Sequence, residues 1–436
     1  MRKPWRIKGN EYYDFYPFVD DKGNVLGEED ILFVSEKELK NRQQVEIWGD
    51  EEEETSREGV HINTPGVRWI CEEEGKFPIA VETPDGELLC HKISKKSGNS
   101  IPNHAGCAKV IRLIMIGAAS SGKSVYTLQL SDPAFHNMIS KHTNVSFEDD
   151  LPTDAFSRYK YEIARENFKK GILPEPSKKN EDIAPYYYYV QCGDMKNKED
   201  AILKIQDIDG ETCKSIKLDS KILQCNHLNL VVGADDLIEG ERGGEAQYDK
   251  VLDQLLPHLR VLQRTRNYEI SVTISKGDLL DRKNPYLKGA FENSISHTNG
   301  KYTQKIHEAG LNYEIFNKRS ECVEKFLKEE CPNFYRKLCN VVKKDNLTFC
   351  MIASVGEECH DNRYENYKPF CIDEPILAIM AKSGLYPIAV EDYNHEVNKI
   401  PGLMSSDFVK ELRRIYRMVK NTFAFRDSGR DEEGWQ

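Results

Sequence analysis

Eight consecutive residues, Gly117-Ala-Ala-Ser-Ser-Gly-Lys-Ser124, match the pattern G-x-x-x-x-G-K-[ST] at every fixed position. Glycines at its first and sixth positions let the chain turn tightly, so that successive backbone N–H groups point inward at phosphate oxygens. In this arrangement Lys123 neutralises the outer phosphates, and the hydroxyl of Ser124 ligates Mg²⁺. The pattern therefore predicts a nucleoside triphosphate, bound with magnesium by Gly117, Ala118, Ala119, Ser120, Ser121, Gly122, Lys123 and Ser124.

The segments around this loop decide between a phosphate site and an ordinary Gly/Ser-rich turn. The apolar run from Val110 to Gly117 predicts a buried strand before the loop, and we expect a helix from Lys123 to about Ile139 after it. The amino end of that helix would add a positive partial charge at the phosphates. This strand–loop–helix context favours nucleotide binding over a plain turn.

A second station, Asp207-Ile-Asp-Gly-Glu211, ends another predicted strand and matches D-x-x-G. In a GTPase this geometry places Asp207 on magnesium through a water, and the N–H of Gly210 on the γ-phosphate. Glu211 would then stand where a water-positioning residue is expected. We therefore predict catalytic roles for Lys123, Gly210 and Glu211.

One magnesium ligand should come from a segment between the phosphate loop and Asp207. The segment Leu173-Pro-Glu-Pro-Ser177 is the candidate, with Ser177 as the ligand and Thr153 as second choice. The predicted metal ligands are thus Ser124, Asp207 and Ser177.

A third motif is expected to recognise the nucleotide base. Ser275-Lys-Gly-Asp278 follows the predicted strand Ile270–Ser275 and resembles [NT]-K-x-D, with Ser in place of Asn or Thr. The Asp278 carboxylate would accept two hydrogen bonds from guanine, while the stem of Lys276 covers the ring. Adenine offers no such pair of donors, so an unpaired carboxylate would disfavour ATP. At the end of the last predicted strand, Ser354 is expected to border the base.

The rest of the chain predicts the fold. From residue 109 onward, apolar and β-branched runs alternate with amphipathic segments, of which the clearest cover residues 245–264 and 313–342. This order, with a tyrosine-rich strand at residues 186–192 in a hairpin, indicates a mainly parallel sheet with helices on both faces and one early antiparallel strand. The preceding residues hold short strand-like pieces separated by turns, and we expect strands at residues 31–34, 45–48, 67–70 and 79–81. We predict a small β-rich domain over 1–107, a nucleotide-binding α/β domain over 108–425, and a polar tail over 426–436.

Composition restricts the function classes. The 436 residues carry a formal net charge of −11, which argues against a surface that coats nucleic acid. No signal peptide opens the sequence, and its longest apolar run is too short for a bilayer. Twelve scattered cysteines then indicate free thiols in a reducing compartment. We expect a cytoplasmic protein that binds GTP and other proteins, but neither nucleic acid nor membrane.

The order of these motifs along the chain resembles that of the bacterial double-GTPase type, a TRAFAC-class, Ras-like P-loop group. The resemblance covers about residues 71–387. It rests on Ser121-Gly-Lys-Ser124, on Asp207–Glu211 with Asp209 where the group has Ala, on Leu230–Asp236, on Ser275–Asp278, and on the helix expected from Pro375. It implies a GTP-hydrolysing switch in a bacterial conflict or defence system.

The resemblance also implies a zinc-ribbon-like segment before the phosphate loop. Here residues 71–107 retain Cys71, Cys90 and Cys107, with His104 and His91 as substitutes, and the chain has no C-x-x-C pair. We therefore expect a degenerate ribbon held by packing; zinc would bind only if the ribbon were intact.

Two alternatives to an active GTPase stay open. The chain could be a P-loop ATPase in which residues 275–278 match by coincidence. It could also be a scaffold that holds nucleotide with little turnover, which Ser275 and Asp209 would favour. An arginine finger is unassigned, with Arg242 as a guess, and Asp235 and Asp236 could face the site or cap the next helix.

Overall fold

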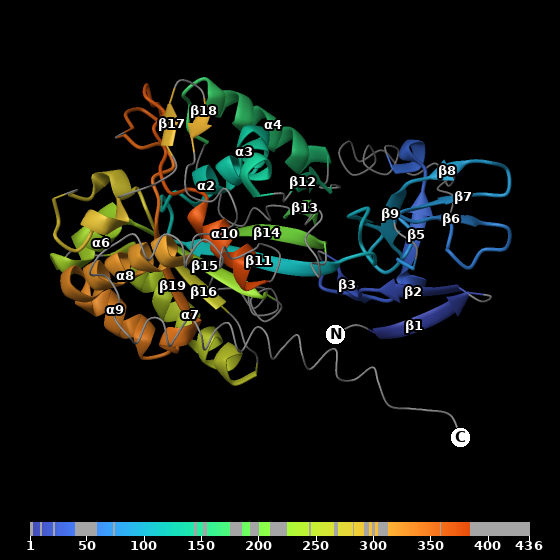
Figure 1. Ribbon diagram of the computed structural model, residues 1–436, viewed down its shortest axis with the longest axis horizontal. Helices are drawn as coiled ribbons and strands as arrows, with labels where there is room; N and C mark the ends of the chain where they lie inside the picture. Colours follow the sequence, from blue (N-terminus) through green and yellow to red (C-terminus); the bar gives the residue numbers. More distant parts are fainter. Residues whose placement is uncertain are drawn as a thin grey trace, which may run out of the picture. The chain divides into compact units, whose positions relative to one another are not determined.

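A seven-stranded sheet with the order β12-β13-β14-β11-β15-β16-β19 carries the phosphate-loop motif (Figure 1). Its five parallel strands are β14 (Ala201–Asp209), β11 (Lys109–Gly117), β15 (His227–Gly233), β16 (Glu269–Ser275) and β19 (Leu347–Met351). Two antiparallel strands, β13 (Tyr186–Gln191) and β12 (Ser146–Asp149), extend it beyond β14. The predicted mainly parallel sheet is confirmed, and β12 is a second antiparallel strand that the sequence did not indicate.

The computed structural model describes residues 3–8, 11–20, 22–39, 59–72, 75–143, 146–150, 155–174, 185–191, 200–209, 225–243, 246–265, 269–281, 283–291, 296–298, 301–303, 313–357 and 359–383. Met1–Ile388 form one compact unit, and the second unit, Ala389–Gln436, lies outside these residues. The predicted tail over 426–436 and the predicted strand at Val45–Trp48 therefore also lie outside them.

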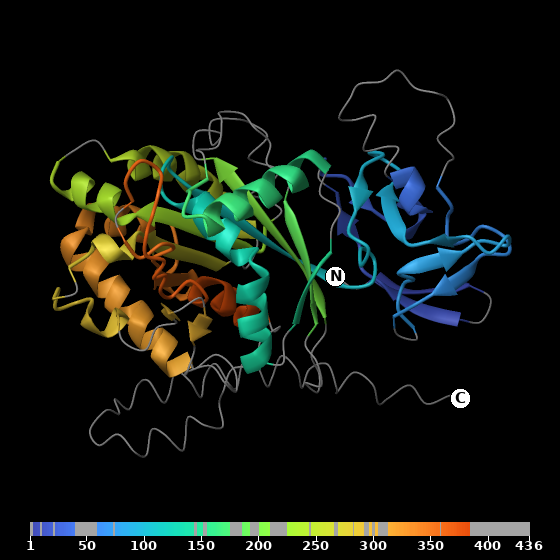
Figure 2. The same ribbon diagram turned by 90° about the horizontal axis from the view of Figure 1, so that it is seen from above.

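Two groups of helices flank the sheet (Figures 1 and 2). One group is α2 (Lys123–Leu130), α3 (Pro133–Thr143) and α4 (Ala155–Lys169). The other is α6 (Ala234–Glu241), α7 (Gln247–Thr265), α8 (Tyr313–Glu330) and α9 (Pro332–Cys339). The last described helix is α10 (Glu374–Lys382). Strands covered on both faces are rich in apolar residues, and β15 is buried along its whole length, with His227 and Asn229 among its otherwise apolar residues and glycine.

Proline divides two of the predicted helices. The helix expected from Lys123 to about Ile139 is interrupted after Leu130, and α3 begins at Pro133. Likewise, the segment from Tyr313 to Val342 is two helices, with Pro332 at the start of the second. Proline lacks an N–H and is favoured in the first turn of a helix, which is where Pro133 and Pro332 lie, although Pro257 lies inside α7.

Short antiparallel strands fill the amino-terminal segment. Within the described residues they form the pairs and sheets β1 (Lys3–Lys8) with β2 (Glu11–Phe15), β3 (Phe18–Val19) with β4 (Val25–Leu26), β5 (Ile31–Val34) with β9 (His91–Ser94) and β10 (Ser100–Ile101), and β6 (Arg68–Ile70) with β7 (Ala80–Glu82) and β8 (Leu88–Leu89). The predicted strands at residues 31–34, 67–70 and 79–81 correspond to β5, β6 and β7.

These strands share an apolar core with one face of the central sheet. Side chains alternate along β13: Tyr186 and Tyr188 enter the core beneath the helices, whereas Tyr187 and Tyr189 join the core of the amino-terminal strands. Ile202 of β14 joins the same amino-terminal core. The boundary proposed between residues 107 and 108 stays a prediction, although contacts of this kind cross it.

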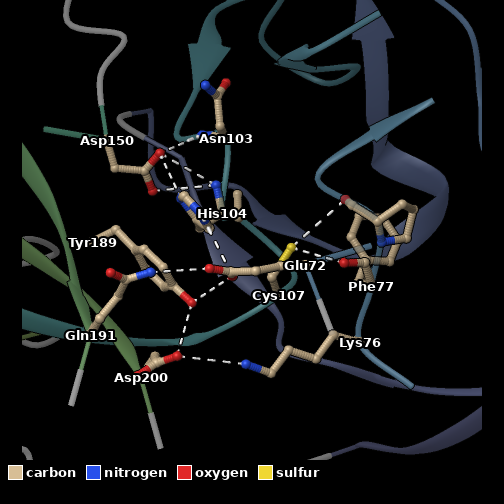
Figure 3. A network of polar contacts seen from close by, with 12 residues as sticks. Glu72, Lys76, Phe77, Asn103, His104, Cys107, Asp150, Tyr189, Gln191 and Asp200 are labelled. Carbon is tan, nitrogen blue, oxygen red and sulfur yellow. Dashed lines mark hydrogen bonds and ion pairs between the residues drawn. The ribbon is translucent and has the colours of Figure 1, made fainter. Parts of the chain in front are cut away.

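A polar network borders that shared core (Figure 3). The His104 ring stacks on the Tyr189 ring with centroids 3.6 Å apart, and its Nδ1 lies 3.1 Å from Oδ1 of Asp150. The Tyr189 hydroxyl lies 2.7 Å from Glu72 and 3.0 Å from Asp200, and its one proton serves one carboxylate at a time. Burial and these neighbours raise the pKa of Tyr189, which keeps the phenol protonated as a donor.

A second buried polar group lies at the start of α10. The Arg319 guanidinium pairs with the Glu374 carboxyl and donates to Sγ of Cys371 at 3.3 Å. Asp373 and Glu374 are both almost completely buried. Burial, with smaller contributions from Cys350, Asp373 and Glu374, raises the pKa of Tyr126 in α2.

Stability should fall as the pH rises from 5 to 8 because of these two carboxyl groups. Burial raises the pKa of Asp373 from 3.8 to about 6 and that of Glu374 from 4.5 to about 8. The folded state therefore keeps protons that the unfolded chain has already lost, and its stability declines by up to about 1.4 kcal/mol per pH unit for each such proton. Urea titrations at several pH values should show a flatter profile for Glu374→Gln than for the wild type. An unchanged slope in that variant would contradict the assignment.

Candidate nucleotide site

The phosphate-loop motif sits between β11 and α2, where two glycines are required for different reasons. A Cβ on Gly117 would lie 2.1 Å from the Val231 carbonyl oxygen, so the close approach of β11 to β15 excludes any side chain there. Gly122, just before α2, has φ 82°, in the left-handed region that favours glycine. The two fixed glycines of the pattern thus have local structural causes.

The Lys123 side chain folds back into the loop. Its ammonium donates to the carbonyl oxygens of Gly117 at 2.7 Å and Ala118 at 2.8 Å, and lies 3.5 Å from the Ser121 hydroxyl. Lys123 is only 7% exposed. A positive charge is therefore buried at the centre of the loop, where an anion would be stabilised.

Ser124 and Asp207 bring two oxygen ligands together beside that lysine. β11 and β14 pair in parallel with Met115 opposite Asp207, which carries the carboxylate to the first turn of α2. The Ser124 hydroxyl donates to Oδ2 of Asp207 at 3.3 Å. A hydroxyl and a carboxylate are hard oxygen donors of the kind Mg²⁺ prefers. These residues therefore fit the predicted magnesium ion.

Ser275 connects the candidate guanine-recognition segment, residues 275–278, to the phosphate loop. Its hydroxyl is buried at the end of β16 and donates to the backbone carbonyl of Ser121, with the Val232 carbonyl 3.3 Å away. The small hydroxyl fits the close approach of β16 to the loop. Ser275 thus fixes residues 276–278 relative to the phosphate-loop motif.

The residues after Ser275 form a rigid turn. Lys276 adopts a left-handed backbone conformation with φ 54°, and the Gly277 N–H donates to the Ile352 carbonyl at 2.9 Å. A Cβ on Gly277 would lie 2.7 Å from Cγ of Met351. Asp278 follows in a short 3₁₀ turn, η3 (Gly277–Leu279), and is partly exposed.

Ser354 follows β19 at the same edge of the sheet. Its backbone carbonyl accepts a hydrogen bond from the side-chain amide of Gln129 in α2, and the same amide donates to the Tyr367 hydroxyl at 2.7 Å. Among the described residues, its own buried hydroxyl has no hydrogen-bond partner. The loop after β19 is therefore fastened to the helix that begins at Lys123.

These contacts place the predicted nucleotide-binding motifs at one edge of the central sheet. β11, β14, β15, β16 and β19 are parallel, so their carboxyl ends, which lead to Gly117, Asp207, Ser275 and Ser354, face the same way. Gly210, Glu211, Ser177 and Thr153 lie outside the described residues, and their roles stay predictions. The backbone of Asp209 pairs with Gly117 at the end of β14.

Two functional contacts were not predicted from sequence. Gln129 reads as an ordinary helical residue, because its partners lie more than 220 residues away along the chain. Asp235 and Asp236, left open between two roles, have different ones. Asp235 pairs with Lys276 at 2.6 Å, whereas Asp236 caps α7 by accepting from the N–H groups of Gln247 and Tyr248, both at 2.7 Å.

Arg242, the guess for an arginine finger, is exposed at the carboxyl end of α6. It lines an open pocket of about 570 Å³ together with Asp235, Ile238, Glu239 and Leu279. The pocket lies beside η3 and not at the phosphate-loop motif. The role of Arg242 as an arginine finger stays a prediction.

The predicted zinc candidates have other contacts. Cys107 is buried, and its thiol donates to the Phe77 carbonyl at 3.0 Å, while Lys92 donates to that sulfur at 3.5 Å. His104 belongs to the network around Tyr189. Among the residues that the structure describes, no group of three or more Cys, His, Asp and Glu side chains is arranged to hold a metal ion. Within that same part of the chain, no helix has the length and apolar character to cross a membrane.

Comparisons with known proteins add little to this geometry. No protein-family model matches the sequence, and no curated protein matches it significantly. Among solved structures, a bacterial selenocysteine-specific elongation factor, EF-Sec, is similar over 57% of this chain and 26% of its own, with 15% identity and a TM-score of 0.22. The present chain thus spans about a quarter of that factor's length, and a TM-score this low does not establish a shared fold.

Proposed function

We propose that the chain binds GTP with Mg²⁺ at the carboxyl edge of the central sheet and hydrolyses it as a molecular switch with a Ras-like, TRAFAC-class fold. The observation that carries this proposal is the hydrogen bond from Ser275 to the Ser121 carbonyl. It joins a loop suited to phosphate and a loop suited to guanine into one site. The strand order, with an antiparallel β13 next to β14, supports the same interpretation.

Each residue would contribute to binding or to charge stabilisation. Lys123 would exchange its carbonyl partners for phosphate oxygens, and Ser124 with Asp207 would hold the magnesium ion. The ion supplies positive charge next to the β- and γ-phosphates. Catalysis would then consist of positioning and electrostatic stabilisation, with Gly210, Glu211 and Ser177 completing the site as predicted.

The wider setting is also part of the proposal. The family resemblance, rather than any residue of the site, supports a switch in a bacterial conflict or defence system. Protein partners would contact the amino-terminal segment and the segments that respond to the γ-phosphate.

Nucleotide selectivity tests the proposal. Fluorescent GTP should bind the magnesium-loaded protein more tightly than the ATP analogue, and Asp278→Ala should weaken GTP binding by about a hundredfold because two charge-assisted hydrogen bonds are lost. Asp281→Ala, which removes an exposed carboxylate three residues later, is the matched control and should leave the preference intact. Equal or tighter ATP binding that is indifferent to Asp278 would instead identify an ATPase. Phosphate release from GTP then distinguishes a hydrolase from a scaffold.

A further inference from the structure

The backbone of residues 275–278, the candidate guanine-recognition segment, is held in place. The long side chain of Lys276 stays adjustable. Lys276 is held by its left-handed conformation, by the bond from the Gly277 N–H to Ile352, and by the close packing of Gly277 on Met351. The four-carbon stem of a lysine is flexible and carries considerable rotamer entropy. A lysine that must lie over a base therefore benefits from a group that fixes its end.

Asp235 supplies such a group from a different element. It lies in the first turn of α6, directly after β15, and its Oδ2 is 2.6 Å from the Lys276 ammonium. Its other oxygen folds back over Gly233, where a Cβ would come within 2.4 Å of it. The carboxylate is therefore held close to the chain rather than extended into solvent.

The neighbouring carboxylate shows that this contact is specific to Asp235. Asp236 has the same charge and the same helical turn, yet both of its oxygens accept backbone N–H groups of α7. Glu239 and Arg242 line the same pocket as Asp235, and the Lys276 ammonium forms its ion pair with Asp235. Asp235 and Asp236 are therefore adjacent residues of the same type with different contacts, which makes Asp236 a control for Asp235.

We propose that Asp235 is a positioning residue for nucleotide recognition, holding the Lys276 ammonium so that the lysine stem covers one face of the bound base. This inference rests on the proposed function. Asp235 acts through Lys276 and does not touch the nucleotide. Because the pair is partly exposed, with side chains 34% and 49% accessible, its effect on affinity is modest and sensitive to salt.

A double-mutant cycle on the full chain tests this role. With GDP and GTP analogues in low salt, Asp235→Ala should weaken binding about two- to fivefold. Lys276→Ala should weaken it at least as much, and the double variant should be no worse than Lys276→Ala alone. The Asp235→Ala effect should shrink at about 0.5 M salt, and Asp235→Glu should restore part of the affinity.

Asp236→Ala is the control, since it should lower thermal stability through the lost α7 cap while leaving nucleotide affinity unchanged. Additive effects in the cycle, tighter binding by Asp235→Ala, or loss of stability without a change in affinity would overturn the positioning role. Those outcomes leave the proposed function standing, provided that the wild type binds GTP. A wild type that binds neither GTP nor GDP would overturn both.

Discussion

Lys123→Ala is expected to lower the affinity for GTP by at least about a hundredfold and to abolish measurable hydrolysis. The lysine carries the buried positive charge at the centre of the phosphate-loop motif, within 2.8 Å of two backbone carbonyls. Removing a preorganised donor from such a site costs about 10²–10³ in rate, and the loss of a whole charge opposite a triphosphate should cost at least as much. Isothermal titration and a phosphate-release assay measure the two effects.

The same change should not destabilise the protein without ligand. The ammonium is desolvated, and its contacts with the Gly117 and Ala118 carbonyl oxygens and the Ser121 hydroxyl are hydrogen bonds to neutral groups, so the cost of burying its charge offsets what its removal loses. Lys123→Met retains most of the stem volume and is the better variant for a melting curve. A variant that loses several degrees of Tm along with its GTP binding would show that the lysine mainly supports the loop.

Arg319→Met is expected to reduce the free energy of unfolding by about 3–5 kcal/mol, the largest effect on stability that we predict. The guanidinium is 3% exposed and pairs with Glu374, while Asp373 lies buried beside them. Without it, one carboxylate charge would remain buried and uncompensated, or a proton would have to be taken up. Chemical denaturation at pH 7 gives the loss directly.

A second substitution should recover much of that loss. Arg319→Met combined with Asp373→Asn removes the guanidinium together with the neighbouring carboxyl group, whose pKa of about 6 leaves it ionised at pH 7, and replacing buried charges of both signs together is often close to neutral. The double variant should therefore be more stable than Arg319→Met alone. If the two losses instead simply add, the pair is not the source of the stability.

Local patterns predicted the central sheet and the phosphate loop. The strands predicted at residues 110–117, 186–192 and 270–275 were assigned correctly because apolar, aromatic and β-branched residues dominate each of them and turn residues bound them. The glycine pattern located the loop because its fixed positions follow from backbone geometry. The breaks at Pro133 and Pro332 were missed, although proline was the available signal.

Contacts between distant segments were not accessible to such patterns. The bond from Gln129 to Ser354 and the ion pair of Asp235 with Lys276 join residues that only the folded sheet brings together. β12 was missed because its four residues, Ser146–Asp149, are half exposed and include two acidic side chains. A strand of this kind is selected by its partner β13 and not by its own composition.

Side chains of the amino-terminal strands cover one face of the central sheet. Tyr187, Tyr189 and Ile202 point away from the helices and are covered by Phe18, Phe77 and their neighbours. A fragment that began at residue 108 would expose this aromatic surface to water and leave Tyr189 without its stacking partner, His104. The purified fragment would therefore be prone to self-association, and full-length protein is the appropriate material for every measurement above.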